Sequence, residues 1–299
     1  MEQQLRVGLV GAGPWARRVH APAIADHPGT RLSAVWARRR AAAEEVAGPH
    51  GAQVVDSPDE LLTGDLVDAV AFAVPPDVQA ELAIRAAQAG RHLILEKPVA
   101  ATLADARRLA DAVEQAGVAS LVVLTRRFAP ETRAWLEELR RLEGWTGGSA
   151  RWLSGALLGG DYSASEWRHR DGGALLDVGP HAVDLLDAAL GPITEVLAAH
   201  RSPRDLWHLV LGHFGGAVST VVLSGRLPVR PTIVEFSVYG EHGYRSLSGR
   251  DTPPLECFTN LLDDFVAMVV SGTTTHPCDV RRGLHLQWVL DTAYRMTIG

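Results

Sequence analysis

A glycine-rich turn near the start of the chain constrains the fold more than any other feature. The apolar run Leu5–Val10 leads directly into Gly11-Ala12-Gly13-Pro14-Trp15-Ala16, and a helical pattern then follows to about residue 26. In this setting Gly11 permits a tight turn, Gly13 lets the backbone approach a pyrophosphate, and Ala16 allows the helix to pack closely on the strand. The N-terminus of such a helix offers free N–H groups to phosphates. The stretch predicts a dinucleotide site, although similar glycines also occur in ordinary turns.

Strand and helix patterns alternate through the first part of the chain. Apolar strand patterns lie at residues 5–10, 31–36, 53–55, 67–74, 93–95 and 119–124, with helical patterns between them. This alternation predicts an α/β fold with a doubly wound parallel sheet. From residue 125 onward a helix is followed by β-like runs joined by short turns, and two helices close the chain. That second pattern predicts an α+β domain with an open, largely antiparallel sheet.

We therefore expect a dinucleotide-binding domain over residues 1–124 and a substrate-binding and oligomerisation domain over residues 125–299. An open sheet can pack against a second copy of itself. The chain is thus expected to form a homo-oligomer, a dimer or a tetramer, through the second sheet.

The end of the second strand bears on the choice of cofactor. NAD sites usually have Asp or Glu there, which accepts a hydrogen bond from the ribose 2′-hydroxyl. This chain has Ala37, followed by Arg38, Arg39 and Arg40. A guanidinium can bind a 2′-phosphate through paired hydrogen bonds. The pattern favours NADP(H) over NAD(H); the alternative is that the arginines only open a solvated helix.

Lys97 is the only lysine in the chain, since every other basic side chain is arginine. It lies in Glu96-Lys97-Pro98, directly after a buried strand, where open α/β sheets bind their ligands. A lysine ammonium is a compact donor whose pKa falls readily on burial, whereas a guanidinium stays charged. Lys97 is thus a candidate for contact with a reacting oxygen, unless it is simply a surface lysine. The turn at Pro75-Pro76 is expected to lie beside Glu96 and Lys97, over the nicotinamide end.

Asp177 and His181 lie four residues apart in a stretch made mostly of Gly, Ala, Val and Leu. This spacing places both side chains on one face of a helix. Histidine titrates near neutrality and is the usual general acid or base when an alcohol becomes a carbonyl. Asp184, one turn later, could orient the imidazole ring. The alternative is a histidine that only packs on an amphipathic helix.

With these motifs in view, the chain resembles the Gfo/Idh/MocA oxidoreductases, the group of glucose-fructose oxidoreductase and inositol dehydrogenase. The resemblance covers nearly the whole length and rests on Gly11-x-Gly13-x-x-Ala16, Pro75-Pro76-Asp77, Glu96-Lys97-Pro98, Arg126-Arg127-Phe128 and Gly172-Gly173-Ala174-Leu175-x-Asp177-x-Gly179-x-His181-x-x-Asp184. It implies a Rossmann domain and a catalytic group at the positions of Lys97, Asp177 and His181. It also implies hydride transfer between NAD(P) and a secondary alcohol carbon of a sugar, sugar nucleotide or cyclic polyol. Asp171 and Gln79 depart from the pattern, because the family often has Gly and His at these places.

Roles follow for the remaining candidates. His181 is expected to exchange a proton with the substrate hydroxyl, Lys97 to stabilise charge on the reacting oxygen, and Asp177 to accept from an adjacent hydroxyl. Three further residues are expected to contact the substrate: Arg126, Trp167 and Arg168. Arg168 would bind a carboxylate or phosphate of the substrate, or else form a surface salt bridge.

Composition narrows the alternatives. A formal charge of −6 disfavours a general nucleic-acid binder. No apolar run approaches the roughly 20 residues that span a bilayer, so we expect a cytoplasmic protein that acts on a small molecule. Cys257 and Cys278 lack metal spacing, and the histidines show no ligand pattern, so no metal site is expected. The rival interpretations are an imine or enone reductase of the same fold, a hydrolase that retains its cofactor, and a nucleotide-sensing protein without turnover.

Overall fold

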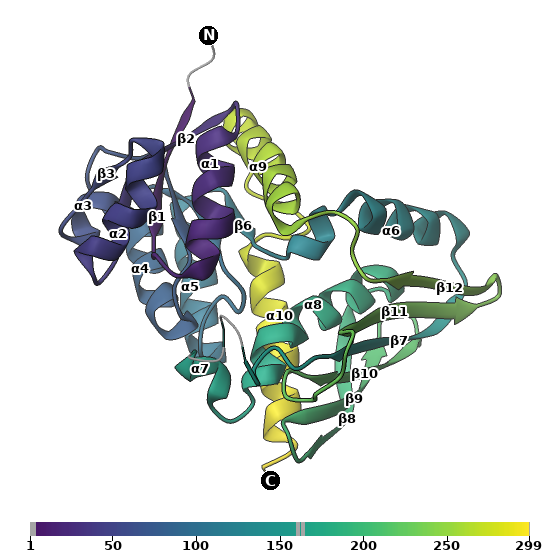
Figure 1. Cartoon of the computed structure of the whole chain (residues 1–299). Helices are drawn as coiled ribbons and strands as arrows, with labels where there is room; N and C mark the ends of the chain where they lie inside the picture. Colours follow the sequence, from purple (N-terminus) through teal and green to yellow (C-terminus); the bar gives the residue numbers. More distant parts are fainter. Residues whose placement is uncertain (1–3, 160–161, 163–164, 299) are drawn as a thin grey trace. The chain divides into compact units, whose positions relative to one another are not determined.

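The computed structural model describes residues 4–159, 162 and 165–298, and the chain forms two compact units (Figure 1). The first unit comprises the residues up to Phe128 together with Thr252–His285. The second comprises Ala129–Asp251 and the residues from Leu286 onward. Residues 252–285 thus return to the first unit after the second sheet is complete. The division into domains of residues 1–124 and 125–299, which the sequence suggests, stays a prediction.

The first unit is built on a six-stranded parallel sheet with the order β3-β2-β1-β4-β5-β6. Its strands are β1 (Leu5–Val10), β2 (Thr30–Trp36), β3 (Gln53–Val54), β4 (Ala69–Phe72), β5 (His92–Leu95) and β6 (Ser120–Val122). β4 is buried throughout and β1 over its last four residues, as expected for parallel strands covered by helices. The strand order reverses between β1 and β4. Open α/β sheets bind ligands at such a reversal, outside the carboxyl ends of the strands.

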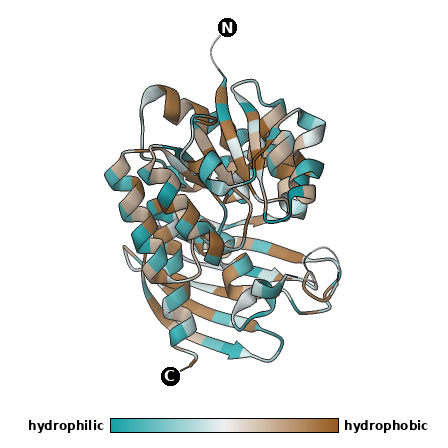
Figure 2. Ribbon diagram, turned by 90° about the vertical axis from the view of Figure 1, so that its left-hand side faces the viewer, coloured by the Kyte–Doolittle hydropathy of each residue, from teal (hydrophilic) through white to brown (hydrophobic). Residues whose placement is uncertain are grey.

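Helices connect these strands and share their apolar core. They are η1 (Ala16–His20), α1 (Ala21–Asp26), α2 (Arg40–Ala47), η2 (Gly48–His50), α3 (Pro58–Leu62), α4 (Pro76–Gln88), α5 (Leu103–Ala116) and η3 (Thr125–Phe128). Local signals set several helix ends: the hydroxyls of Ser57 and Thr102 accept from backbone N–H groups of α3 and α5, and Gly117 ends α5 with a φ of 62°. Helix α9 (Pro254–Ser271) lies beside α1, far from it in sequence (Figure 1). Figure 2 shows the hydrophobic colour on strands of both sheets and on parts of several helices.

The second unit contains a six-stranded mixed sheet with the order β12-β11-β7-β10-β9-β8. Its strands are β7 (Trp145–Leu153), β8 (Ile193–Ser202), β9 (Leu206–His213), β10 (Val218–Ser224), β11 (Ile233–Gly240) and β12 (Gly243–Ser248). Only the β7–β10 pair is parallel among the described strands of this sheet. In β9 the side chains of Trp207, Leu209 and Leu211 are buried, whereas His208 between them is exposed. This period of two indicates a sheet with one covered face.

Helix α8 covers that face by packing on β7 and β10. The other helices of this unit are α6 (Pro130–Leu142), α7 (Glu166–His169), α8 itself (Gly173–Leu190) and α10 (Val280–Arg295), within which the boundary between the units falls. Gly172 precedes α8 with a φ of 74°. Among the described residues, no helix is both long enough and apolar enough to cross a membrane.

The expected fold class is confirmed for both sheets. Strand β12 was not predicted, because Gly243–Ser248 is partly exposed along its length and shows no apolar alternation. Its place beside β11 follows from the tight hairpin that joins the two strands, in which Gly240 pairs with Gly243. Cys257 and Cys278 are both buried free thiols.

Candidate functional site

The predicted cofactor residues gather at the carboxyl edge of the first sheet. Each group follows the end of one strand: Gly11, Gly13, Pro14, Trp15 and Ala16 after β1; Ala37, Arg38 and Arg39 after β2; Pro75 and Pro76 after β4; Glu96 and Lys97 after β5. These four strands are neighbours and run parallel, so their carboxyl ends lie along the same edge. The topology therefore brings together residues that are far apart in sequence.

The two glycines of the first turn have different surroundings. Gly11 has a φ of 121°, and a Cβ atom there would lie 2.4 Å from the carbonyl oxygen of Ala73. The fold itself thus requires glycine at position 11. A Cβ atom on Gly13 would meet nothing within 4 Å. The open space at Gly13 fits the close approach of a dinucleotide pyrophosphate to the backbone, next to the start of a helix.

The helix that follows begins with a π-helical segment, Ala16–His20. Such segments are rare and often occur at functional sites. His20 is fully buried, its Nε2 atom lies 2.9 Å from Oε1 of Glu96, and its ring centroid lies 4.4 Å from that of Phe258. This contact connects the helix after the glycine turn to the turn that carries Lys97.

The arginines after β2 separate into two groups. Arg40 begins α2 and forms ion pairs with Glu44, at 3.0 Å, and with Asp56. It therefore behaves as the arginine of a solvated helix start. Arg38 and Arg39 are exposed and form no ion pair with any described residue.

The turn after β5 is held by a side chain from α4. Gln79 is fully buried, its Nε2 donates to the carbonyl oxygens of Glu96 at 2.7 Å and Val99 at 3.0 Å, and its Oε1 accepts from the backbone N–H of Glu96 at 2.9 Å. Lys97 is half-buried, and its backbone N–H donates to Oε2 of Glu96 at 3.2 Å. Helix α4, which starts at Pro76, thus lies beside the lysine turn, whereas the place of the Pro75-Pro76 turn over the nicotinamide end stays a prediction.

Asp177 and His181 lie on α8 in the second unit. Asp177 forms an ion pair with Arg168, whose Nε atom lies 3.1 Å from Oδ2 of the carboxylate. The Arg168 guanidinium also lies over two aromatic rings, 4.2 Å from the centroid of Trp167 and 4.6 Å from that of Tyr162. The structure shows a salt bridge of Arg168 with Asp177, but both side chains are mostly buried, so this is not the surface salt bridge that the sequence suggested as an alternative.

His181 is almost fully buried and stacks on Trp152. The ring centroids are 5.5 Å apart and the planes differ by 19°. Trp152 comes from β7, so a strand of the second sheet supplies a stacked neighbour for the imidazole ring. Asp184 is 1% exposed on the next turn of α8, and its role in orienting the ring stays a prediction.

Asp171 anchors the segment before α8. Its carboxylate accepts a hydrogen bond from the Tyr294 hydroxyl at 2.9 Å and forms an ion pair with Arg201. The hydrogen bond from Tyr294, together with Arg201, holds the pKa of Asp171 below its usual range, and the same carboxylate raises the pKa of Tyr294. Asp205 in turn accepts from the backbone N–H of Ala174 at 2.7 Å. A carboxylate at this helix N-terminus is favourable because the first N–H groups have no partner within the helix.

Sequence reasoning missed the roles of His20, Gln79 and Trp152. His20 and Gln79 are buried, and the other buried residues of their helical segments are apolar. A polar side chain at a core position is therefore the signal that the sequence offers. Trp152 lies in β7, and nothing in its local sequence indicates a functional role. Arg126, predicted to contact the substrate, is buried in η3 of the first unit.

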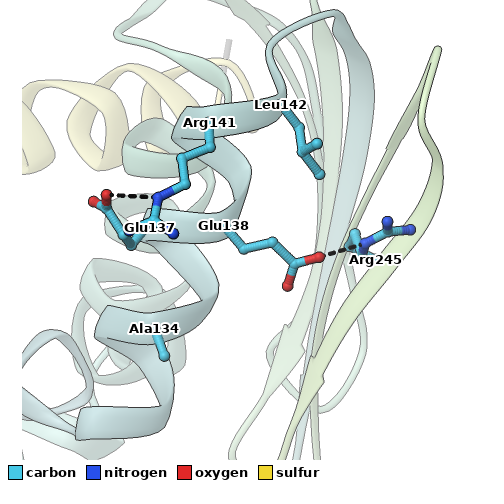
Figure 3. Close-up of a pocket in the computed structure, with 6 residues that line it drawn as sticks. All are labelled: Ala134, Glu137, Glu138, Arg141, Leu142 and Arg245. Carbon is cyan, nitrogen blue, oxygen red and sulfur yellow. Dashed lines mark hydrogen bonds and ion pairs between the residues drawn. The ribbon is translucent and has the colours of Figure 1, made fainter.

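A hollow of about 440 Å³ lies beside α6 and β12 of the second unit (Figure 3). It is lined by Ala134, Glu137, Glu138, Arg141, Leu142 and Arg245. Its charged side chains bind one another: Arg141 donates to Glu137 at 3.2 Å and Arg245 to Glu138 at 2.7 Å. None of the predicted site residues lines this hollow, and we do not connect it with the predicted chemistry. Within the described part of the chain, no three His, Cys, Asp or Glu side chains are grouped to hold a metal ion.

Two family models match the chain. Residues 5–124 match the oxidoreductase family model GFO_IDH_MocA with an NAD-binding Rossmann fold, and residues 148–245 match the GFO/IDH/MocA C-terminal domain. The chain belongs to the Gfo/Idh/MocA family. The matched ranges include the glycine turn, Lys97, Asp177 and His181.

Curated relatives include proteins with named activities. The dTDP-3,4-didehydro-2,6-dideoxy-alpha-D-glucose 3-reductase of Streptomyces violaceoruber is 33% identical over 74% of this chain and 66% of its own length. The scyllo-inositol 2-dehydrogenase (NAD(+)) of Bacillus subtilis is 26% identical over 67% of this chain and 58% of its own length. The chain therefore matches less than two thirds of the length of each.

Solved structures share the fold over nearly the whole chain. The WlbA dehydrogenase of Bordetella pertussis, in complex with NADH and UDP-GlcNAcA, has a TM-score of 0.85 and 25% identity, and the match covers 99% of this chain and 97% of that one. KijD10, a 3-ketoreductase of Actinomadura kijaniata in complex with NADP, has a TM-score of 0.78 and 20% identity, with coverage of 99% and 98%.

Proposed function

We propose that this protein transfers a hydride between a nicotinamide cofactor and a secondary alcohol or ketone carbon of a sugar, a sugar derivative or a cyclic polyol. One observation carries the proposal. The glycine turn with open space at Gly13 lies at the reversal of the strand order, and the only lysine of the chain ends a nearby strand on the same edge. A structural protein has no need for this combination.

The substrate class rests on the relatives. One is named for reduction at C3 of a dTDP-linked deoxysugar and another for oxidation of scyllo-inositol, and WlbA was solved with a UDP-linked sugar acid. These molecules share a six-membered ring bearing hydroxyl or oxo groups. We therefore propose such a ring as the substrate of this chain.

The bound nicotinamide would supply or accept the hydride, and the chain's own residues would handle the proton and the developing charge. His181, held by Trp152, takes the proton from the substrate hydroxyl during oxidation and returns it during reduction. Lys97 donates a hydrogen bond to the reacting oxygen, where negative charge develops. Asp177 accepts a hydrogen bond from a neighbouring hydroxyl of the substrate ring. Trp167 and Arg168 border the substrate. The joint action of Lys97 with Asp177 and His181 follows from the family pattern.

We propose NADP(H) as the preferred cofactor. Solved relatives hold NADH in one case and NADP in another, so the preference rests on this chain's own residues. Ala37 leaves no carboxylate to repel a 2′-phosphate, and the exposed Arg38 and Arg39 have no ion-pair partner among the described residues. Arg40 is already engaged with two carboxylates and takes no part.

We also propose a homo-oligomer that forms through the second sheet. Apolar or aromatic side chains on its strands are exposed, among them Val218 at 40%, Tyr239 at 48% and Tyr244 at 62%. Light scattering during gel filtration measures the mass of the assembly directly. A monomeric mass at micromolar concentration would remove this part of the proposal.

The test of the proposed function begins with a fluorescence titration by NADPH and by NADH, because Trp15 lies in the glycine turn. A panel of sugars, sugar nucleotides and cyclic polyols is then assayed for change in NAD(P)H absorbance. Binding with turnover of a panel member supports the proposal. Cofactor that stays bound through gel filtration, without net consumption, favours the hydrolase, whereas no binding of either dinucleotide excludes the oxidoreductase.

Two variants test the residue roles once a substrate is known. Lys97→Arg keeps the charge but replaces a compact ammonium by a planar group, so we expect a loss of at least 100-fold in kcat. His181→Ala should lose rate while it keeps its unfolding temperature within a few degrees. A near-normal kcat in Lys97→Arg, or unfolding of His181→Ala, would argue against the respective role.

A further inference from the structure

Several backbone groups around Lys97 form hydrogen bonds with one side chain, that of Gln79. Parallel pairing of β5 ends at Leu95, whose carbonyl oxygen accepts from the N–H of Val123 at 2.8 Å. From Glu96 onward the Gln79 amide supplies the partners: it accepts from the Glu96 N–H at 2.9 Å and donates to the Glu96 carbonyl at 2.7 Å. It also donates to the carbonyl of Val99 at 3.0 Å and approaches that of Pro98 at 3.4 Å.

Gln79 has no exposed surface, and its contacts with the carbonyls of Pro98 and Val99 are buried. A buried carbonyl that loses its donor is costly, because no water replaces it. The amide is also the side-chain group suited to this place, since one carboxamide carries both an acceptor and two donors. Apolar or acidic side chains of similar size cannot make the same set of bonds.

A second contact holds the same turn from another element. The carboxylate of Glu96 receives the backbone N–H of Lys97 on Oε2 and the imidazole of buried His20 on Oε1. The main chain on both sides of Lys97 is therefore bound to α4 and to η1. Buried neighbours that pack against a functional residue and form hydrogen bonds around it can hold its position to within a fraction of an ångström.

We infer that Gln79 is a positioning residue for Lys97. It holds the backbone of the turn so that the ammonium is presented at the carboxyl edge of the sheet, and it is not itself in contact with the reacting atoms. This inference rests on the proposed function only in that Lys97 acts on the substrate; the placement of the lysine by Gln79 can be tested without any substrate.

The single lysine of the chain makes this test direct. Protein grown with [ε-¹³C]lysine carries the label at Lys97 alone, so a carbon–proton spectrum contains one lysine signal. We compare wild type with Gln79→Glu, which keeps the size but replaces the donor, and with Gln79→Asn, which keeps the amide but shortens its reach. The matched control is Gln88→Glu, an exposed position on the same helix with the same change of charge.

We expect Gln79→Asn and Gln79→Glu to shift the Lys97 signal, while Gln88→Glu leaves it unchanged. With a substrate from the panel, kcat should fall at least tenfold, with the Kd for NADPH within threefold of wild type. In Gln79→Glu the loss should diminish as the pH falls, because a protonated carboxyl regains one donor. If Gln79→Glu does not fold, Gln79→Asn decides.

A Lys97 signal that does not move in a folded Gln79 variant overturns the inference, even if the unfolding temperature falls, because Gln79 would then serve the fold alone. The same spectrum separates this failure from failure of the proposed function. If the Gln79 variants shift the Lys97 signal but the wild-type protein turns over no panel substrate, the positioning role is supported and the proposed substrate class is not.

Discussion

The guanidinium of Arg168 lies 3.1 Å from the carboxylate of Asp177, so two residues expected to contact the substrate separately bind each other. Both side chains are mostly buried, and Trp167 and Tyr162 border the guanidinium. The carboxylate is thereby given a fixed direction. In the proposed site, Arg168 would therefore influence the substrate by orienting the Asp177 carboxylate.

This arrangement predicts that the two residues are energetically coupled. Arg168→Met and Asp177→Asn should each lower kcat/KM at least tenfold, whereas the double variant should lose little more than the larger single loss. A coupling of about 1 kcal/mol or more is expected for residues in direct contact. Arg151→Met serves as the control, because Arg151 pairs with Glu235 on β11. Losses that simply add would mean that Arg168 binds a substrate group independently of Asp177.

The two glycines of the first turn predict opposite outcomes for the same substitution. Gly13→Ala should keep or slightly raise stability, by about 0.4–1 kcal/mol, because its Cβ meets nothing and its φ is not positive. It should nevertheless weaken NADPH binding at least tenfold, since the methyl group occupies the space left for the pyrophosphate. Gly11→Ala should instead destabilise the fold by about 1–3 kcal/mol, through its positive φ and its contact with Ala73. Urea unfolding and NADPH titration of both variants measure the contrast; unaltered NADPH binding in Gly13→Ala would count against the predicted pyrophosphate site.

The arginine run predicts a change of cofactor preference. Replacing Arg38 and Arg39 together by Gln should raise the Kd for NADPH tenfold or more, a loss of about 1.4 kcal/mol, with the Kd for NADH nearly unchanged. Arg40→Gln is the matched control: it removes the ion pairs to Glu44 and Asp56 and should leave the ratio of the two Kd values as it was. Equal weakening of both cofactors in the double variant would indicate a general electrostatic effect without recognition of the 2′-phosphate.

The sequence could predict this fold because its strongest signals are local. Apolar runs of strand length, Ser57 and Thr102 at helix starts, and the glycine turn each specify a short element, and their alternation leaves few topologies. The positions of Ala37, Pro75 and Lys97 then follow, because parallel strands place all their carboxyl ends on one edge. Strand β12 lacked such a signal and was missed.

Contacts between distant elements could not be predicted in the same way. That Gln79 reaches Glu96, or that Trp152 stacks on His181, depends on side-chain rotamers and on how a helix packs against its neighbours. The sequence showed only a polar residue at an apolar position, which indicates a buried partner without identifying it. Arg168 illustrates the same limit, because the sequence alone was compatible both with a substrate anion and with a carboxylate of the protein as its partner.

His92, the first residue of the strand that leads to Lys97, predicts a pH-dependent stability. Burial lowers the pKa of His92 below its ordinary value of 6.5, and its Nδ1 accepts the backbone N–H of Ala119 at 3.0 Å, which requires that nitrogen to be unprotonated. The unfolded chain therefore binds a proton near pH 6.5 that the folded chain does not. By linkage, the contribution of His92 is complete above about pH 6.5 and is lost as the pH falls below it toward the folded pKa. In the second unit, burial lowers the pKa of His213 in the same sense.

Urea unfolding at intervals between pH 8 and pH 5 tests this expectation. His92→Asn keeps an acceptor near the position of Nδ1 but cannot titrate, so its stability should fall less steeply below pH 6.5 than that of wild type. The difference between the two curves should not exceed about 1.4 kcal/mol for each unit by which the pKa is lowered. His208→Asn, at an exposed position, should follow the wild-type curve. Parallel curves for wild type and His92→Asn would mean that His92 has the same pKa in the folded and the unfolded chain, which would contradict the lowered pKa.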